Sequence, residues 1–183
     1  MIKKYLLVML VLLSLEAEEL DRTGPYIALG GGYALYEDGR QSNLEMDPSY
    51  NINFIAGAFI NKYLSVELAL DYYNEFQSKD LSDSAKAMII DVDTKAHYSF
   101  WHDQIDLYGA FGAGQIFWSE NVLGVGSTST SAVLRGDIGI GYRIGHDYTL
   151  NIGARRYFFN LEQLDDTYNM NINSFYTNLE VQF

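Results

Sequence analysis

Residues 50–72 read YNINFIAGAFINKYLSVELALDY, and the side chains along this stretch alternate with a period of two. From Tyr50 to Ile60 every second residue is apolar, while the intervening positions begin with two asparagines. After the short segment 61–63 the same alternation resumes. A period of two is typical of a β-strand with one apolar face, so the stretch predicts two antiparallel strands joined by a tight turn.

The same alternation recurs along the rest of the chain and predicts eight strands in all. The predicted strands cover residues 25–36, 50–60, 64–72, 88–98, 105–118, 134–143, 148–155 and 175–183. Both prolines, Pro25 and Pro48, fall at strand edges, where a missing backbone N–H is tolerated. The pattern therefore predicts an all-β fold.

The connections between these strands alternate strictly between long and short. The long, polar ones are 37–48, 75–84, 120–130 and 160–170, and the short ones are 61–63, 99–104 and 144–147. An up-and-down meander that crosses a membrane has short periplasmic turns and longer extracellular loops. An even number of strands also returns both chain ends to the periplasm. We therefore predict an eight-stranded, antiparallel, up-and-down transmembrane β-barrel.

Aromatic residues on the apolar register distinguish this barrel from a soluble β-sandwich. One group falls near the predicted periplasmic strand ends, namely Tyr98, Tyr142, Tyr148 and Phe183, and another near the opposite ends, namely Tyr50, Tyr72, Phe117, Phe158 and Phe175. Two aromatic belts separated by aliphatic residues are typical of a wall that meets lipid headgroups on both sides. The alternative is the general enrichment of aromatic residues in strands.

The composition excludes several classes of function. The 183 residues include 24 acidic and 12 basic side chains, for a net charge of −12, which argues against a nucleic-acid partner because such binding depends on Lys and Arg. The absence of cysteine excludes disulfides, thiolate metal sites and a cysteine nucleophile.

The first residues have the features of an exported protein. Lys3 and Lys4 precede an apolar stretch from Tyr5 to Leu13, and Ala17 offers a small residue for cleavage. The apolar stretch is too short for a membrane anchor, since about 30 Å of hydrocarbon must be crossed at 1.5 Å per helical residue. We therefore predict that residues 1–17 form a cleaved signal peptide and that residues 18–183 form the barrel domain in the cell outer membrane.

The register opposite the apolar one carries charges of both signs and is predicted to face the lumen. The predicted network consists of Glu67, Asp91, Asp93, Lys95, Arg135, Asp137, Arg143, Arg155 and Glu180. An eight-stranded barrel has an interior that side chains just fill, so we expect these groups to form ion pairs that plug the lumen. Inward glycines, among them Gly112 and Gly139, are expected to make room for the long side chains opposite them.

Arg156 breaks the alternation, because it follows Arg155 and so faces lipid if the strand is regular. Three interpretations remain open. The side chain snorkels toward headgroups, it binds a lipopolysaccharide phosphate, or a β-bulge shifts the register at this point.

The chain ends in Phe175-Tyr176-Thr177-Asn178-Leu179-Glu180-Val181-Gln182-Phe183, and glycine and tyrosine gather in residues 24–33 and 107–114. With these features the chain resembles the small eight-stranded outer-membrane barrels of the OmpA/OmpX-like, porin-like superfamily. The resemblance implies outer-membrane insertion by the barrel-assembly machinery. It also implies an assembly signal made by Phe175, Leu179, Val181 and Phe183. Members of this superfamily differ widely in activity, so the fold does not give the function.

The sequence favours a structural or surface-interaction protein, adhesin-like or receptor-like. Its expected partners are outer-membrane lipids, lipopolysaccharide and an extracellular partner that meets the four long segments. We expect a monomer with no cofactor, catalytic residue or metal. A narrow channel and a lipid A-modifying enzyme remain as alternatives. His97-Tyr98-Ser99 offers a His-x-Ser pair, and the turns with His102, Asp103, His146 and Asp147 offer weak metal ligands.

We predict that deletion of Phe183 impairs assembly, because the last strand then loses its terminal apolar residue and the recognition signal implied by the resemblance. The measurement is the amount of heat-modifiable barrel in outer-membrane fractions. Wild-type levels of folded barrel in the deletion strain would contradict the prediction.

Overall fold

The computed structural model describes residues 22–38, 46–78, 83–122, 124–163 and 166–183. The predicted signal peptide lies outside these residues. The strands are β1 (Gly24–Asp38), β2 (Ser49–Asn61), β3 (Leu64–Gln77), β4 (Ser84–Phe100), β5 (Ile105–Val122), β6 (Val125–Ile144), β7 (Tyr148–Gln163) and β8 (Asp166–Gln182). The described residues include no helix long and apolar enough to cross a membrane.

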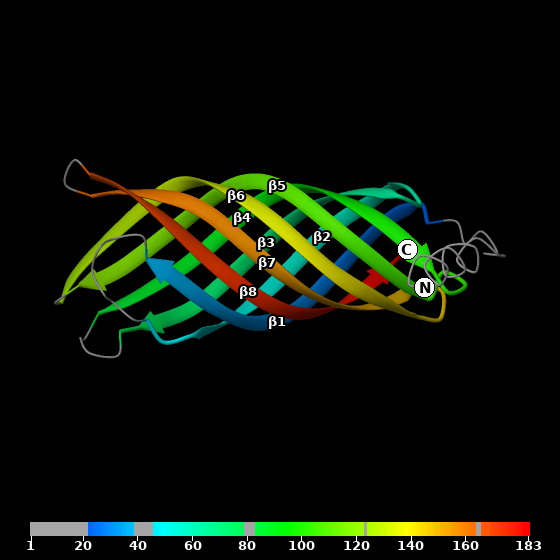
Figure 1. Ribbon diagram of the computed structural model, residues 1–183, viewed down its shortest axis with the longest axis horizontal. Helices are drawn as coiled ribbons and strands as arrows, with labels where there is room; N and C mark the ends of the chain where they lie inside the picture. Colours follow the sequence, from blue (N-terminus) through cyan, green and yellow to red (C-terminus); the bar gives the residue numbers. More distant parts are fainter. Residues whose placement is uncertain (1–21, 39–45, 79–82, 123, 164–165) are drawn as a thin grey trace, which may run out of the picture.

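The eight strands form one closed barrel in sequence order. Each strand pairs antiparallel with the next, and β1 pairs with β8 to close the ring, with Tyr26 opposite Gln182. Figure 1 shows long, tilted strands with the start of β1 and the end of β8 at the same end of the barrel. The predicted eight-stranded antiparallel barrel is confirmed. We assign the end with the short turns to the periplasm.

The predicted alternation sets which side chains face outward along the middle of each strand. In β3, for example, Leu68 and Leu70 are exposed on the outer wall, while Glu67 and Asp71 are buried inside. A closed ring of strands leaves no unpaired backbone group in hydrocarbon. In a bilayer the exposed apolar side chains of this ring contact lipid. The outer wall is therefore apolar and the lumen at the same height is polar.

Two of the four predicted long connections are wrong. Most of residues 120–130 and 160–170 belong to strands, because β5 continues to Val122 and β6 begins at Val125. The hairpin reverses near Gly124, whose φ of 82° suits glycine. Here the strands rise beyond the lipid, so neither face has to be apolar. The alternation that identifies strands in the membrane therefore disappears, and the serine- and threonine-rich residues 127–131 lie in a paired strand.

The other two long connections are shorter than predicted. β1 extends to Asp38 and β3 to Gln77, and an isolated bridge joins Met46 to Ser78. Residues 39–45 and 79–82 of the predicted connections lie outside the described residues.

One β-bulge changes which residues face the lumen. The pairing of β3 with β4 shifts between Tyr73 and Phe76, so that both of these aromatic side chains are buried inside the barrel. Strict alternation would have placed Phe76 on the outer wall.

β7 has no β-bulge at Arg156, although a bulge was one of the three interpretations of this residue. Its pairing with β6 and with β8 runs through Arg156 without a register shift, and the side chain lies on the outer wall. The bulge interpretation is therefore wrong.

Glycines on the inner wall make room for large side chains on the neighbouring strand, as predicted. Tyr108 lies directly opposite Gly139 and Tyr26 opposite Gly57, and in each pair a Cβ on the glycine would collide with the tyrosine ring. This pairing accounts for part of the high glycine and tyrosine content.

We predict that Gly112→Ala destabilises the barrel by about 1–3 kcal/mol, the usual cost of overpacking. A Cβ at residue 112 would collide with the Asp93 carboxylate and with the Val92 carbonyl oxygen. Gly136→Ala is the control, because nothing lies within 4 Å of a Cβ there. The measurement is the temperature at which the folded gel mobility is lost. Equal midpoints for the two variants would contradict the prediction.

Candidate functional site

The centre of the lumen is organised around Arg135 on β6. Its guanidinium contacts Asp91 Oδ1 at 2.8 Å and Asp137 Oδ2 at 2.8 Å, and it also pairs with Asp93. Glu67 Oε2 lies 3.9 Å away. Because these side chains are almost wholly buried, Asp91 and Asp93 depend on this cation for charge compensation.

A second arginine bridges opposite walls of the barrel. Arg155 Nη1 on β7 lies 2.6 Å from Asp71 Oδ2 on β3, and these strands are four apart in the ring of eight. Arg155 Nε also lies 2.9 Å from Asp137 Oδ2, which joins this pair to Arg135. The ion pairs therefore form one connected network across the bore.

Lys95 occupies the periplasmic side of this network. Its Nζ donates to Glu67 Oε1 at 2.9 Å and lies 4.2 Å from the centroid of the Tyr108 ring. The ring face favours the ammonium group electrostatically.

Inward-pointing tyrosines donate hydrogen bonds to the buried carboxylates, which outnumber the cations of the network. The network contains more acids than bases, with Glu67, Asp71, Asp91, Asp93 and Asp137 against Lys95, Arg135 and Arg155. The Tyr26 hydroxyl donates to Glu67 at 2.6 Å, and the Tyr176 hydroxyl donates to Asp137 at 2.8 Å. The Tyr157 hydroxyl lies 2.8 Å from Asp71 and 3.0 Å from Asp91. These neutral donors stabilise buried carboxylates without adding charge.

The other two predicted network residues lie on its periplasmic side. Glu180 accepts a hydrogen bond from Asn151 at 3.2 Å, and Arg143 is buried toward the periplasmic end. Both side chains lie on the inner wall, and Glu180 interacts electrostatically with Lys95, but neither makes the predicted ion pair in the described part of the chain.

A separate polar cluster lies at the periplasmic end. His97 Nδ1 is 2.8 Å from Asp106 Oδ2, and His97 Nε2 is 2.9 Å from Ser65 Oγ. Arg22, which precedes β1, reaches the same Asp106 at 2.9 Å. Ser99 donates to the other oxygen of Asp106, so the predicted His-x-Ser pair meets through this carboxylate.

The order Ser65, His97, Asp106 resembles the hydrogen-bond relay of a serine hydrolase. However, Ser65 is 0% exposed, and its Oγ also lies 3.1 Å from the Tyr26 hydroxyl. A substrate has no route to this hydroxyl as it is packed here. The cluster is therefore a set of buried side chains that hydrogen-bond to one another near the periplasmic end of the lumen.

The weak metal ligands do not form a site. His102 and Asp103 lie in the β4–β5 turn, where both have positive φ, and His146 and Asp147 lie in the β6–β7 turn. In the part of the chain that the structure describes, no three His, Asp or Glu side chains gather as metal ligands would.

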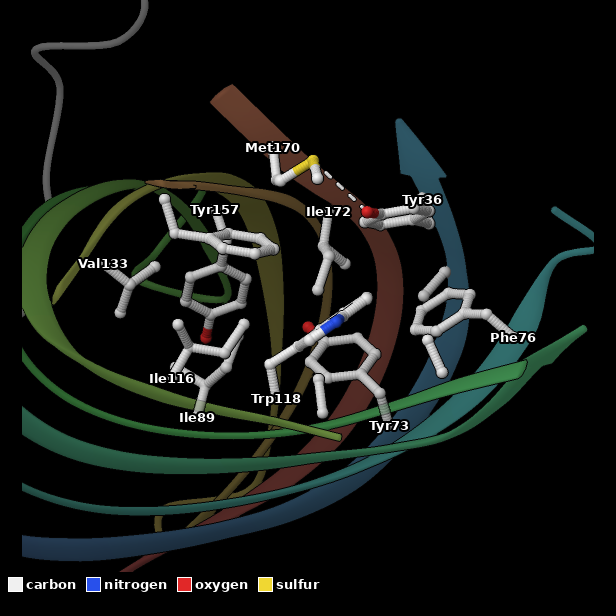
Figure 2. Packing of buried hydrophobic residues seen from close by; sticks show 14 of the residues in the cluster. Tyr36, Tyr73, Phe76, Ile89, Ile116, Trp118, Val133, Tyr157, Met170 and Ile172 are labelled. Carbon is white, nitrogen blue, oxygen red and sulfur yellow. Dashed lines mark hydrogen bonds between the residues drawn. The ribbon is translucent and has the colours of Figure 1, made fainter. Parts of the chain in front are cut away.

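The extracellular half of the lumen is apolar, which the sequence reasoning missed. Figure 2 shows the side chains of this cluster filling the space between the walls. The Tyr36 ring on β1 stacks on Trp118 on β5 at 5.0 Å, and the Tyr36 hydroxyl lies 3.3 Å from Met170 Sδ. The other buried members are Ala34, Tyr73, Phe76, Ala85, Ala87, Ile89, Ile116, Val133, Tyr157, Phe159, Leu161 and Ile172.

A family model described as the outer membrane protein beta-barrel domain matches residues 5–183. The chain belongs to this family. Solved structures with the same fold include neisserial surface protein A, with 17% identity over 87% of this chain and 97% of that one and a TM-score of 0.71. OprG from Pseudomonas aeruginosa is 10% identical over 88% and 98% of the two chains, with a TM-score of 0.60.

Ail, the attachment invasion locus protein of Yersinia pestis, is 15% identical over 86% of this chain and 99% of its own, with a TM-score of 0.55. At these identities the likeness shows the fold alone. Among curated proteins no sequence matches the chain. As an outer-membrane barrel, the protein has the architecture and location that its alternation predicts.

The last strand of this outer-membrane barrel places the residues of the expected assembly signal. Phe175, Leu179 and Phe183 are exposed on the outer wall, and Val181 is half-buried. The Phe183 N–H donates to the Pro25 carbonyl at 3.0 Å, so the end of the chain helps to close the barrel against β1. Their role in assembly stays a prediction.

We predict that Arg135→Ala lowers the stability of the barrel by about 3–5 kcal/mol, because it leaves buried carboxylates without their cation. Lys86→Ala is the control, since Lys86 is an exposed cation on β4, away from the buried network. Stability is measured by denaturant unfolding in detergent micelles. An Arg135→Ala barrel as resistant as the Lys86→Ala barrel would contradict the importance of the network.

Proposed function

We propose that this outer-membrane barrel is a non-conducting surface-interaction protein, which presents a β-sheet extension to partners outside the cell. Contacts between opposite walls support the non-conducting part. Arg155 meets Asp71 in the polar half of the lumen, and Tyr36 meets Trp118 in the apolar half, each pair lying on strands four apart. Both halves of the bore are thus crossed by direct side-chain contacts, which argues against the narrow channel.

The proposed interaction surface is the open edge of the β5–β6 hairpin. Pairing of β6 with β7 begins at Val133, whereas pairing of β6 with β5 begins at Val125. Among the described strands, residues 125–132 therefore have a neighbour on one side only. Figure 1 shows the tips of the β5–β6 and β7–β8 hairpins apart, at the end away from the termini.

An open strand edge offers a row of backbone N–H and C=O groups to an extended peptide. Residues 126–131 read GSTSTS, so this edge bears small hydroxyl side chains and no charge. Lysine, proline and inward charges, which commonly block exposed edges, are missing from this segment. The chemistry fits an extracellular protein that adds an extended segment as a further strand.

The lipid A-modifying alternative finds less support. The histidines of the sequence lie at or near the periplasmic end, and Ser65, the hydroxyl bonded to His97, is wholly buried. An enzyme acting on the outer leaflet would need its reactive groups at the opposite end of the barrel.

A shortened hairpin tests the proposed interaction. Residues 120–121 pair with residues 126–127, so removing both sets keeps the register, the alternation and the turn while shortening the edge. We predict that the wild-type barrel in nanodiscs binds members of a panel of purified extracellular-matrix and serum proteins, and that the shortened barrel loses this binding. Lys86→Ala serves as the full-length control. Unchanged binding by the shortened barrel would contradict a role for this edge.

A further inference from the structure

The lipid-facing wall is interrupted by a groove of about 660 Å³ that lies across β6, β7, β8 and β1. Gly136 and Ala154 form part of its floor, and Ile138, Phe158 and Phe175 stand around them. A Cβ on Gly136 would meet nothing within 4 Å, so the space above this residue is open. Small residues among large ones on an apolar wall leave a recess of the kind that an acyl chain fills.

A polar cluster lies at one edge of this groove. Arg156 Nη2 is 2.9 Å from Glu37 Oε2, and Asn173 Nδ2 donates to Glu37 Oε1 at 2.7 Å. The side chains of Arg156 and Glu37 are 45% and 52% exposed on the outer wall. The Arg156 guanidinium also lies 5.2 Å from the centroid of the Phe158 ring, which lines the groove.

The height of the cluster matches the outer edge of the membrane. On β7, Arg156 lies eight residues beyond Tyr148, which belongs to the periplasmic aromatic belt. Eight residues at about 3.3 Å each, on a strand tilted by about 40°, rise by about 20 Å. The apolar band of such barrels is about 25 Å tall, so Arg156 lies about 5 Å below the outer-leaflet headgroups, a distance that its long side chain spans.

We propose that this wall binds one lipopolysaccharide molecule of the outer leaflet through its lipid A part. One acyl chain lies in the groove over Gly136 and Ala154, while Glu37, Arg156 and Asn173 hydrogen-bond to the sugar headgroup. The geometry is that of an amphiphile site, with an apolar recess ending at polar groups.

The charges of the cluster favour a sugar headgroup over a simple phospholipid. Glu37 neutralises Arg156, so a phosphate alone gains little net attraction and meets a carboxylate. A glucosamine headgroup offers hydroxyl and amide donors to Glu37, and acceptors to Arg156 and Asn173. The site therefore distinguishes headgroups by hydrogen bonding more than by charge.

Native mass spectrometry of the purified, detergent-solubilised barrel with added lipid A tests the proposal. The wild-type barrel is expected to retain lipid A, and Gly136→Leu to lose it because the new side chain fills the groove. Arg156→Ala should weaken retention about tenfold, the effect of one charge-assisted hydrogen bond. Ala58→Leu, which places a leucine side chain on the outward face of β2, is the control and should bind as the wild type does.

Each result decides a part of the proposal. Wild-type retention by Gly136→Leu would overturn the groove, and equal retention of phosphatidylethanolamine by the wild-type barrel would overturn headgroup recognition. Heat-modifiable gel mobility shows that each variant is folded. Should Gly136→Leu fail to fold, Ala154→Leu on β7 fills the same groove and decides in its place.

Discussion

The ion pair between Arg155 and Asp71 is the contact on which the rest of the interior depends. It joins β7 to β3 across the bore and is continued by Asp137 to Arg135. A barrel wall in lipid must point its polar side chains inward, and a buried charge without a partner costs several kcal/mol. The charged residues on different strands are therefore compatible with the fold, because they lie at one height along the barrel axis and form ion pairs there. The tyrosine hydroxyls add hydrogen bonds to Glu67, Asp137 and Asp71, because the five carboxylates of the network share only three cations.

The barrel reverses its inside and outside chemistry along its length. At the height of the membrane the outer wall is apolar and the lumen holds the ion pairs, whereas in the extracellular half the lumen holds the Tyr36 and Trp118 cluster. The reversal follows from the solvent on the outside. Above the lipid, water surrounds the strands, and the hydrophobic effect then favours an apolar interior, as in a soluble protein. One change of surroundings thus explains both layers of the lumen, and each layer has a contact between opposite walls.

Much of the fold could be predicted from alternation, because lipid requires an apolar outer face on every strand that it touches. Residues 120–130 did not follow this rule, since that hairpin lies in water on both faces and carries no periodic signal. The inward register predicted which charged residues face the lumen, but not that Arg143 and Glu180 form no direct ion pair in the described part of the chain. Partners across the bore depend on the stagger of the strands, which a single sequence does not display. Arg22 was missed because it precedes β1, and the inward tyrosines were missed although Tyr26 and Tyr108 lie opposite glycines.

Single-channel recording of the purified barrel in planar bilayers tests the central claim most directly. Contacts between opposite walls in both halves of the lumen predict no steady current from the wild-type barrel. They also predict that the Arg155→Ala/Trp118→Ala double variant, which removes one contact from each half, conducts once it is shown to be folded. Steady, large single-channel currents from the wild-type barrel would contradict the account.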